Sequence, residues 1–215
     1  MTVYYSLYGQ LLDINNLYKG FKKVKSAKGA AGIVGQSISA FALNLEINLK
    51  QLQLELQTKQ YQAQAVKRVE ILKDDGGVRL LGIPAVRDRI VQQALLNILQ
   101  PIFDIDFHPS SYGYRPKRSC HDAISKATVF IRKHHLDWVV DMDLSKCFDL
   151  LDHELTISSV KRKVTDGSIL KLINQFLKSG VMIGNNWAAS TVGSPQGGVI
   201  ALCWRTSTLM LSIRK

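Results

Sequence analysis

The sequence predicts a mixed fold of the α/β (α+β) class, and three observations indicate it. Residues 66–72 are rich in β-branched side chains and lead into an Asp-Gly-Gly turn and a second apolar run, as a hairpin does. Several other segments carry apolar residues at helical spacing and begin at Asp or Ser, as capped helices do. A further apolar run, Trp138–Leu144, alternates like a strand. There is no internal repeat.

Composition indicates a globular protein with a polyanionic partner. Of 215 residues, 46% are hydrophobic, and 28 Lys and Arg outnumber 17 Asp and Glu, giving a formal charge of +11. This balance favours nucleic acid first and an anionic membrane surface second. No apolar stretch reaches the roughly 18 residues of a spanning helix, and no signal pattern begins the chain. We therefore expect a cytoplasmic protein without a membrane partner, with its three cysteines reduced.

The N-terminal third combines a basic segment with a helix. Residues 18–36 hold five lysines among four glycines, which predicts a mobile segment that either contacts phosphates or is a solvated linker. Over residues 37–57 an alternating apolar pattern competes with a helical one. Many Leu, Gln and Glu and few β-branched residues favour the helix.

The hairpin is followed by a predicted helix with a marked start and end. Lys73 and Arg79 flank the hairpin turn and could reach a common anion, although surface hairpins often carry basic residues for solubility alone. Asp88 can cap the next helix through its side-chain oxygen, and Pro101 is expected to end that helix.

Three more helices are predicted from their caps. Ser119 and Asp122 resemble a capping box, while Asp152 and Asp166 are expected to cap two later helices, the second stopped by Gly180. The five histidines lack ligand partners at convincing spacing, so surface or capping roles are expected for them. Trp138 is expected in the core.

Two acidic residues stand at strand spacing in VVDMDLSKCFDLLDH. In a strand Asp141 and Asp143 share one face, and a cation such as Mg²⁺, which takes oxygen ligands, would relieve their repulsion. The alternative is that both pair with lysines. In SPQGGVI, residues 194–200, the glycines permit close approach to a ligand and Gln196 can donate and accept, although any Gly-rich turn allows the same.

Three blocks in this order resemble the reverse transcriptases encoded by bacterial and organellar group II introns: ILKDDGGVRLLGIPAVRDRIVQQALLNILQPIFDIDFHPSSYGYRPKRSCHDAI, VVDMDLSKCFDLLDH and GSPQGGVI. The resemblance spans nearly all of residues 8–200. It implies a reverse-transcriptase fingers and palm arrangement with an antiparallel palm sheet. It also divides the chain into an N-terminal extension over 1–60 and a partial fingers-palm domain over 61–202.

The resemblance implies a nucleotide site. Asp143 would hold the two Mg²⁺ ions of nucleotidyl transfer, assisted by the backbone carbonyl of Leu144. Phe148 matches the gate that stacks under the incoming sugar and favours deoxynucleotides. Lys73 and Arg79 match the residues that clamp the triphosphate. Asp141 stands at a variable position and is not expected to be catalytic.

Further contacts follow from the same resemblance. Gln196 matches the residue that touches the nucleotide sugar and the neighbouring template, and Gly197 is its close-packed partner. RNA phosphates would be contacted by five basic residues: Lys22, Lys23, Lys25, Lys28 and Arg115. The implied partners are an RNA template with its primer, the intron RNA and deoxynucleoside triphosphates. Members of the family usually also act as maturases.

The chain departs from the family after GGVI, where a Tyr-Ala-Asp-Asp hairpin and a thumb are expected but absent. Codons for residues 203–215 can be chosen so that another frame reads Leu-Ala-Asn-Ile-Tyr-Leu, the expected family helix. We therefore expect a frameshifted tail, an incomplete palm, no thumb and no polymerase activity, because one carboxylate cannot fix two metal ions. The alternatives are a noncatalytic RNA-binding, maturase-like fragment and a nonfunctional pseudogene product.

Overall fold

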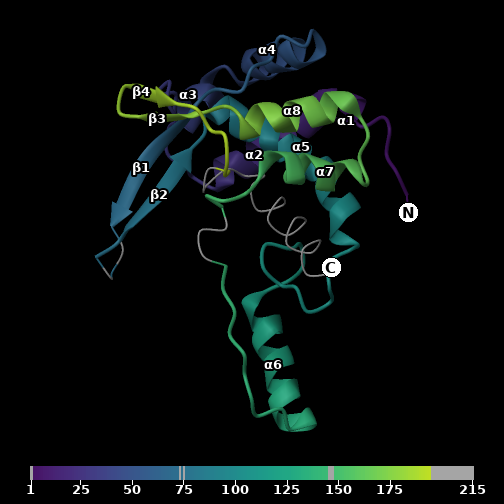
Figure 1. Cartoon of the computed structure of the whole chain (residues 1–215). Helices are drawn as coiled ribbons and strands as arrows, with labels where there is room; N and C mark the ends of the chain where they lie inside the picture. Colours follow the sequence, from purple (N-terminus) through teal and green to yellow (C-terminus); the bar gives the residue numbers. More distant parts are fainter. Residues whose placement is uncertain (1, 73, 75, 145–147, 195–215) are drawn as a thin grey trace.

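The computed structural model describes residues 2–72, 74, 76–144 and 148–194. In these ranges the chain forms helices and strands in the following order: α1 (Tyr8–Leu12), α2 (Ile14–Ser26), α3 (Ile38–Leu43), α4 (Leu45–Gln57), β1 (Val66–Leu72), β2 (Val78–Ile83), α5 (Val86–Asp104), α6 (Cys120–His134), α7 (His153–Lys161), α8 (Gly167–Leu177), β3 (Val181–Ile183) and β4 (Asn186–Ala188). Most helices gather beside the sheet, while α6 projects away from them (Figure 1). The mixed α and β class predicted from the sequence is confirmed.

The sheet has the strand order β2-β1-β3-β4. The predicted hairpin is confirmed: β1 and β2 pair antiparallel from Lys67 opposite Ile83 to Leu72 opposite Val78, and Gly76 in the turn has φ +78°. Because β1 pairs with β3 in parallel and β3 pairs with β4 antiparallel, this sheet, which is built on the hairpin, is mixed.

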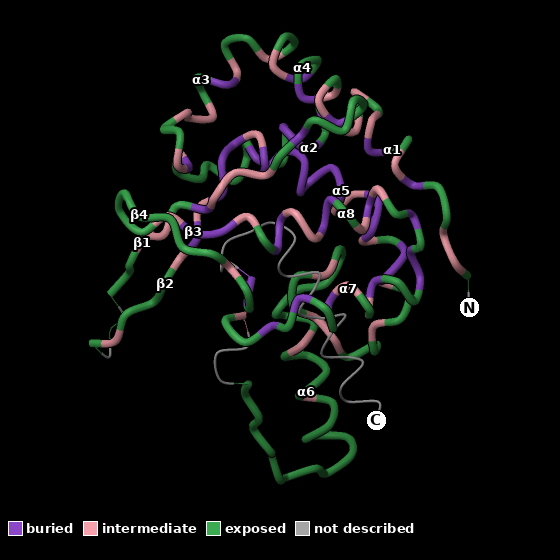
Figure 2. Tube along the Cα trace, turned by 45° about the horizontal axis from the view of Figure 1, so that its top comes forward, coloured by how far each residue is buried: buried purple, intermediate pink, exposed green. Residues whose placement is uncertain are grey.

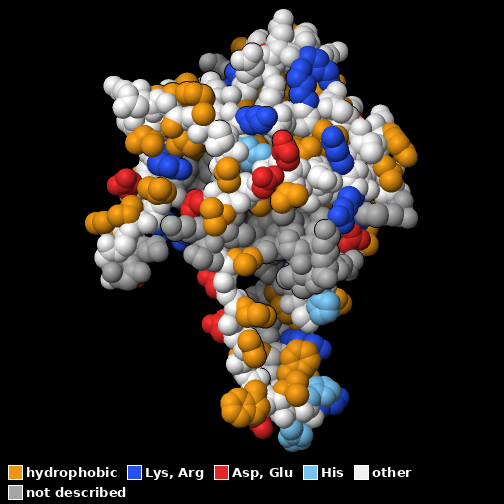
Figure 3. All heavy atoms as spheres, in the orientation of Figure 1, with side chains coloured by type: hydrophobic (Ala, Val, Ile, Leu, Met, Phe, Trp, Pro, Cys, Tyr) orange, Lys and Arg blue, Asp and Glu red, His pale blue; other side chains and the backbone are white. Residues whose placement is uncertain are grey.

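The strand expected over Trp138–Leu144 is not formed. No backbone among the described residues pairs with this segment, and a strand needs a neighbour to satisfy its N–H and C=O groups. Trp138 is 95% exposed, so its expected place in the core is wrong. The segment lies with α6 in an arm whose residues are exposed along most of its length (Figure 2) and which carries many hydrophobic side chains (Figure 3).

Residues 18–36 are not uniformly mobile as expected, because α2 continues through their first half. Leu17, Phe21 and Val24 recur at helical spacing and are buried, and this apolar stripe attaches α2 to the core. Asp13 caps the helix by accepting the N–H of Asn15 at 2.9 Å. A Cβ at Gly20 would lie 2.8 Å from the carbonyl oxygen of Ile90, so glycine permits the close packing of α2 on α5.

Helix α5 is buried along most of its length, and both of its predicted boundaries are wrong. It begins after Ala85, and Asp88 lies in its first turn as a buried side chain. It also continues through Pro101 to Asp104. Burial of Ile102 and Phe103, worth about 1.5–3 kcal/mol each, offsets the roughly 3 kcal/mol cost of a proline inside a helix.

The remaining predicted helices are confirmed. Residues 37–57 form α3 and α4, interrupted at Asn44. Ser119 and Asp122 make both bonds of the capping box, and the Asp152 and Asp166 side chains cap α7 and α8. One cluster of buried apolar residues extends from the N-terminal helices through α5 to α8, so the extension assigned to residues 1–60 shares its core with the rest.

Candidate nucleotide site and nucleic-acid interface

The turn at Phe148–Leu151 is attached to a loop that comes much later in the chain. The backbone N–H of Ser194 donates to the carbonyl of Phe148, and that of Gly193 donates to the carbonyl of Leu151, both at 2.8 Å. Phe148 is half-buried, and Ser194 is buried. These bonds place the predicted sugar gate beside the first residue of the Ser-Pro-Gln-Gly-Gly stretch.

Gly193 is required by both conformation and space. Its φ of +87° lies in the left-handed region, which side-chain-bearing residues rarely adopt. A Cβ at this position would lie 2.8 Å from the Asp149 carbonyl oxygen and 3.0 Å from that of Phe148. The two segments can therefore approach this closely only with glycine here.

The buried side chain of His153 makes a hydrogen bond to the same loop. The side chain is 5% exposed, and Nε2 lies 2.7 Å from the carbonyl oxygen of Gly193. Because a carbonyl only accepts, Nε2 carries the proton and donates. Nδ1 is buried and has no hydrogen-bond partner among the described residues. The surface or capping role expected for this histidine is wrong, because its partner is 40 residues away and no local pattern reveals it.

A small cavity of about 110 Å³ separates the hairpin from this loop. It is lined by Arg68, Leu80 and Gly82 on the strands and by Asp149, Gly193 and Ser194, among others, on the opposite side.

The pairing of the hairpin decides which basic residue faces that cavity. Cross-strand partners share a face, so Arg68 and its partner Gly82 face the cavity, whereas Arg79 and its partner Ile71 lie on the other face of the hairpin. Arg68 is thus a candidate anion-binding residue that the sequence reasoning missed. The alternation within Lys67–Glu70 was its only signal.

Asp143 and Leu144 lie on the exposed segment that follows α6. Asp143 Oδ1 accepts a hydrogen bond from the backbone N–H of Leu144 at 2.9 Å, and Asp141 is exposed nearby in sequence. Within the described ranges, His, Cys, Asp and Glu side chains nowhere gather in threes as a metal-binding group. The predicted site residues Lys73, Gln196 and Gly197 lie outside the described residues.

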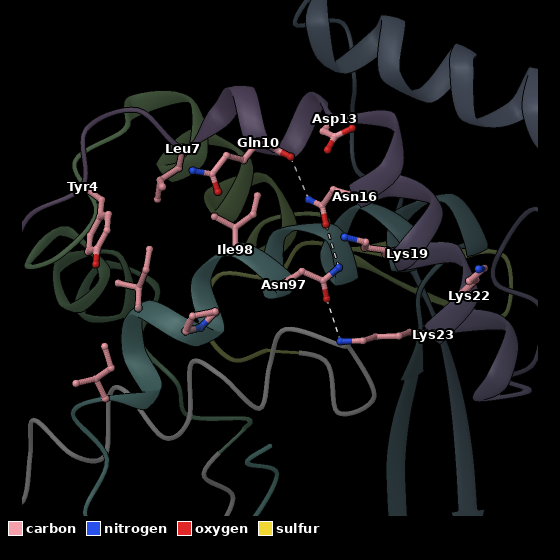
Figure 4. A pocket seen from close by; sticks show the side chains of 13 residues that line it. Tyr4, Leu7, Gln10, Asp13, Asn16, Lys19, Lys22, Lys23, Asn97 and Ile98 are labelled. Atoms are coloured by element: carbon pink, nitrogen blue, oxygen red, sulfur yellow. Dashed lines mark hydrogen bonds between the residues drawn. The ribbon is translucent and has the colours of Figure 1, made fainter. Parts of the chain in front are cut away.

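Lysines line a groove between the N-terminal helices and α5 (Figure 4). We call it the α2–α5 groove; it has a volume of about 850 Å³ and is lined by Tyr4, Leu7, Gln10, Asp13, Asn16, Lys19, Lys22, Lys23, Asn97, Ile98, Pro101, Ile102 and Ile105. Lys22 and Lys23, two of the predicted RNA-binding residues, therefore share this groove with Lys19, which was not among them. Lys25 and Lys28 are exposed but do not line it.

The structure turns Arg115 toward its own chain. Its Nε and Nη2 donate to the Asp104 carboxylate at 2.8 and 3.2 Å, and Nη2 also reaches the Asp104 carbonyl at 3.2 Å. Nη1 donates to the carbonyls of His108 and Ser111 at 3.0 and 2.9 Å, and the side chain is 8% exposed. With its donors used in this way, Arg115 holds the connection after α5 together, which disfavours the expected RNA contact.

A family model described as reverse transcriptase (RNA-dependent DNA polymerase) matches residues 71–209. The chain is 39% identical over 181 residues to Protein YkfC of Escherichia coli K12, covering 82% of this chain and 48% of that protein. It is 33% identical over 202 residues to the group II intron-encoded protein LtrA of Lactococcus lactis, covering 93% and 33%. The chain thus spans less than half the length of these relatives.

A solved structure shares the fold. The chain superposes on a chain of the partial Cas6-RT-Cas1–Cas2 complex with a TM-score of 0.64 and 19% identity, covering 95% of this chain and 34% of that one. Likeness at this identity speaks for the fold alone. No helix within the described ranges is long and apolar enough to cross a membrane.

Proposed function

Because this chain belongs to the reverse transcriptases and maturases encoded by group II introns, we propose that it is an RNA-binding portion of an RNA-directed DNA polymerase that does not extend primers by itself. The attachment of the Phe148 turn to Gly193 and Ser194 supports this proposal, since one nucleotide can touch both motifs only if they lie together. In this proposal residues 1–60 are the N-terminal extension, 61–202 the partial fingers-palm domain and 203–215, outside the described residues, a frameshifted tail.

The predicted nucleotide-site residues and the surface lysines have proposed roles, whereas Arg115 is assigned to holding its own chain together. Phe148 packs under the sugar of an incoming deoxynucleoside triphosphate, and Gln196 and Gly197, which lie outside the described residues, contact that sugar and the neighbouring template. From the hairpin, Lys73 and Arg79 were expected to bind the triphosphate; because Arg79 lies on the face away from the cavity, Arg68 takes its place in this proposal. The surface lysines contact RNA phosphates of a template or of the intron, and this makes binding sensitive to salt.

The donor groups do not fit a site for two Mg²⁺ ions. Bound Mg²⁺ supplies charge neutralisation to nucleotidyl transfer in this family, and Asp143 with the Leu144 carbonyl would be this chain's contribution. In the described ranges, no second and third carboxylate stand beside them. We therefore assign no catalytic step to this chain alone.

Primer extension tests the proposal directly. The purified chain is mixed with an RNA template, an annealed DNA primer, deoxynucleoside triphosphates and Mg²⁺, and the products are separated by length. We expect no extension. Extension by the wild type that disappears in Asp143→Ala would overturn the proposed inactivity and would identify a complete catalytic centre.

RNA binding is measured in parallel with the same template. We expect submicromolar affinity that weakens steeply with salt and is unchanged in Asp143→Ala, because the exposed carboxylate contributes nothing to phosphate binding. A chain that binds no RNA and unfolds without cooperativity would contradict the proposal. That result would favour the nonfunctional product of a decayed gene, whose exposed α6 arm fits poor folding.

A further inference from the structure

We propose that the α2–α5 groove binds an unpaired segment of RNA, with its lysines on the phosphates and its apolar floor against the face of a base. This inference rests on the proposed RNA binding and adds where the RNA lies and which form of it is bound. The groove volume of about 850 Å³ is within the range of about 300–1,000 Å³ seen for ligand sites.

Charge along the groove favours a polyanion. Lys19, Lys22 and Lys23 stand three and four residues apart on α2, so their amino groups lie along one wall. In the described part of the chain, none of the three is in an ion pair. The single carboxylate of the groove, Asp13, already accepts the N–H of Asn15 as the cap of α2. The Asp13 carboxylate keeps its charge when it accepts this bond and can offset one of the three lysines, so among the described residues the wall keeps a net positive charge.

A chain of amide groups fixes the position of one lysine, as the dashed lines in Figure 4 show. Asn16 donates to the Gln10 carbonyl at 3.2 Å, as drawn, and to the Ala94 carbonyl at 3.0 Å, and Asn97 donates to Asn16 Oδ1 at 3.0 Å. Lys23 Nζ then donates to Asn97 Oδ1 at 3.0 Å, which leaves its two other N–H groups for a phosphate. Because the two Asn side chains are occupied with one another, they position Lys23 and do not read base edges.

The floor of the groove is apolar and partly open to solvent. Its lining includes the buried side chains of Leu7, Ile98 and Ile102, and solvent reaches its apolar side chains at Pro101 and at Ile105, which is 79% exposed. An unpaired base can lay its face on such a surface, whereas the bases of a duplex are stacked on one another inside the helix. A row of lysines beside an apolar floor therefore selects single-stranded RNA over duplex RNA, without preference for sequence.

Fluorescence anisotropy with two probes tests this inference. The probes are a fluorescein-labelled oligouridine and a duplex RNA of equal strand length. The groove variant combines Lys19→Gln, Lys22→Gln and Lys23→Gln, and its control removes the same charge elsewhere through Lys50→Gln, Lys126→Gln and Lys133→Gln. All six side chains are exposed, so both variants are expected to fold, which circular dichroism verifies.

The wild type is expected to bind oligouridine at least about tenfold more tightly than the duplex, since stacked bases cannot reach the floor. The groove variant is expected to lose about tenfold or more in affinity for oligouridine. Its slope of log affinity against log salt is expected to fall by about 2, for three phosphate contacts on a single strand. The control is expected to change both quantities far less.

A floor variant separates base contact from charge. Ile105→Ser changes no charge, so we expect about a threefold loss of affinity for oligouridine with an unchanged salt slope. Cross-linking of the wild type to 4-thiouridine RNA is expected to label Tyr4 or residues near Ile105, and this measurement needs no variant. Cross-links that map only outside the groove would overturn the inference.

Other results would overturn it as well. Equal losses in the groove and control variants would mean that total charge alone matters. Equal or tighter binding of the duplex would refute selection for unpaired bases, and full displacement of the RNA by polyglutamate at equal charge would indicate an acidic protein as the occupant. If the wild type binds neither RNA, the proposed function fails together with this inference. If the wild type binds RNA and the groove variant binds it equally well, this inference fails alone.

Discussion

The hydroxyl of Tyr61 donates a 2.6 Å hydrogen bond to Oδ1 of Asp88, inside the junction between α4, the hairpin and α5. The other carboxylate oxygen accepts the backbone N–H of Gln64 at 2.9 Å, just before β1. Asp88 thereby connects α5 to the segment that leads into the hairpin. Burial raises the pKa of Asp88 to about 6, although the bonds from Tyr61 and Gln64 oppose the shift. Burial and the nearby Asp88 charge raise the pKa of Tyr61 well above its usual value.

The raised pKa of Asp88 predicts that the free energy of unfolding falls as pH rises. A raised pKa means that the folded chain holds the proton more tightly than the unfolded chain, so stability is greatest below the ordinary value of 3.8 and falls until pH exceeds about 6. The shift corresponds to a loss of about 3 kcal/mol in the free energy of unfolding. Urea unfolding at several pH values measures it, and in Asp88→Asn this part of the slope is expected to vanish. An unchanged slope in Asp88→Asn would contradict the assignment.

Removing the Tyr61 hydroxyl is expected to increase the loss of stability that accompanies ionisation of Asp88. In Tyr61→Phe the buried carboxylate loses a donor, so the pKa of Asp88 rises further and the chain is destabilised above pH 6 by about 1–3 kcal/mol. Tyr114→Phe, at a tyrosine that is 74% exposed, is the control and is expected to change stability by less than about 0.5 kcal/mol. Equal effects of the two changes would argue against a specific role for the bond.

Two helical glycines provide a matched test of how closely α2 and α5 pack. Gly20→Ala places a Cβ 2.8 Å from the Ile90 carbonyl oxygen, so we expect destabilisation of about 1–3 kcal/mol. At Gly9 in α1, no described atom beyond the adjoining residues and the helix's own backbone lies within 4 Å of an added Cβ, so for Gly9→Ala we expect a neutral effect or a gain of up to about 1 kcal/mol. Thermal and urea unfolding measure both. A stabilising Gly20→Ala would show that the helices can move apart at little cost.

Asp166 connects two helix starts that are distant in the sequence. Its Oδ1 accepts the N–H groups of Ser168 and Ile169 at 3.0 and 3.3 Å, and its Oδ2 accepts those of Leu7 and Tyr8 at 2.8 and 2.9 Å. Burial acts to raise the pKa of this carboxyl, but the four backbone donors outweigh it and hold the pKa below its usual value. Its contribution to stability is thus present above the ordinary value of 3.8 and is lost as pH falls through the lowered pKa.

Asp166→Ala is therefore expected to cost about 2 kcal/mol or more, since it leaves donors of α1 and α8 without their acceptor. Asp152→Ala removes only the cap of α7, a 2.8 Å bond from the Leu155 N–H, and should cost about 1 kcal/mol. Urea unfolding compares the two. A smaller loss in Asp166→Ala than in Asp152→Ala would contradict the double role.

The hydrogen bonds of Arg115 to its own chain predict that a substitution at this residue lowers stability without lowering RNA affinity. Arg115→Lys keeps the charge but cannot reproduce the fork on the Asp104 carboxylate, so we expect a destabilisation of about 1–3 kcal/mol. Arg118→Lys, where the guanidinium lies 5.6 Å from the Tyr112 ring, is expected to stay within about 0.5 kcal/mol. Weakened RNA binding at unchanged stability would instead support the phosphate contact first expected of Arg115.

Local signals in the sequence were sufficient for most elements. The hairpin turn, the capping box of Ser119 with Asp122 and the cap at Asp152 were predicted correctly, because each depends on hydrogen bonds between residues only a few positions apart. The spacing of apolar residues likewise predicted a helix over residues 37–57, where α3 and α4 lie. The three motif blocks led to the family that the comparisons support.

The sequence by itself thus determined the hairpin, the helices from α3 to α8 apart from the ends of α5, the basic charge and the family of this protein, since these follow from neighbouring residues and composition. Only the tertiary structure decided which polar groups are already engaged within the chain. Asp88 became a buried connector, His153 a support for Gly193 and Arg115 an internal clamp, while Lys19 joined a groove. The physical reason is that burial and hydrogen-bond partners depend on segments that are distant in the sequence and meet only in the folded chain. The sequence alone therefore does not distinguish a helix cap or a ligand-binding residue from a residue that is engaged inside the protein.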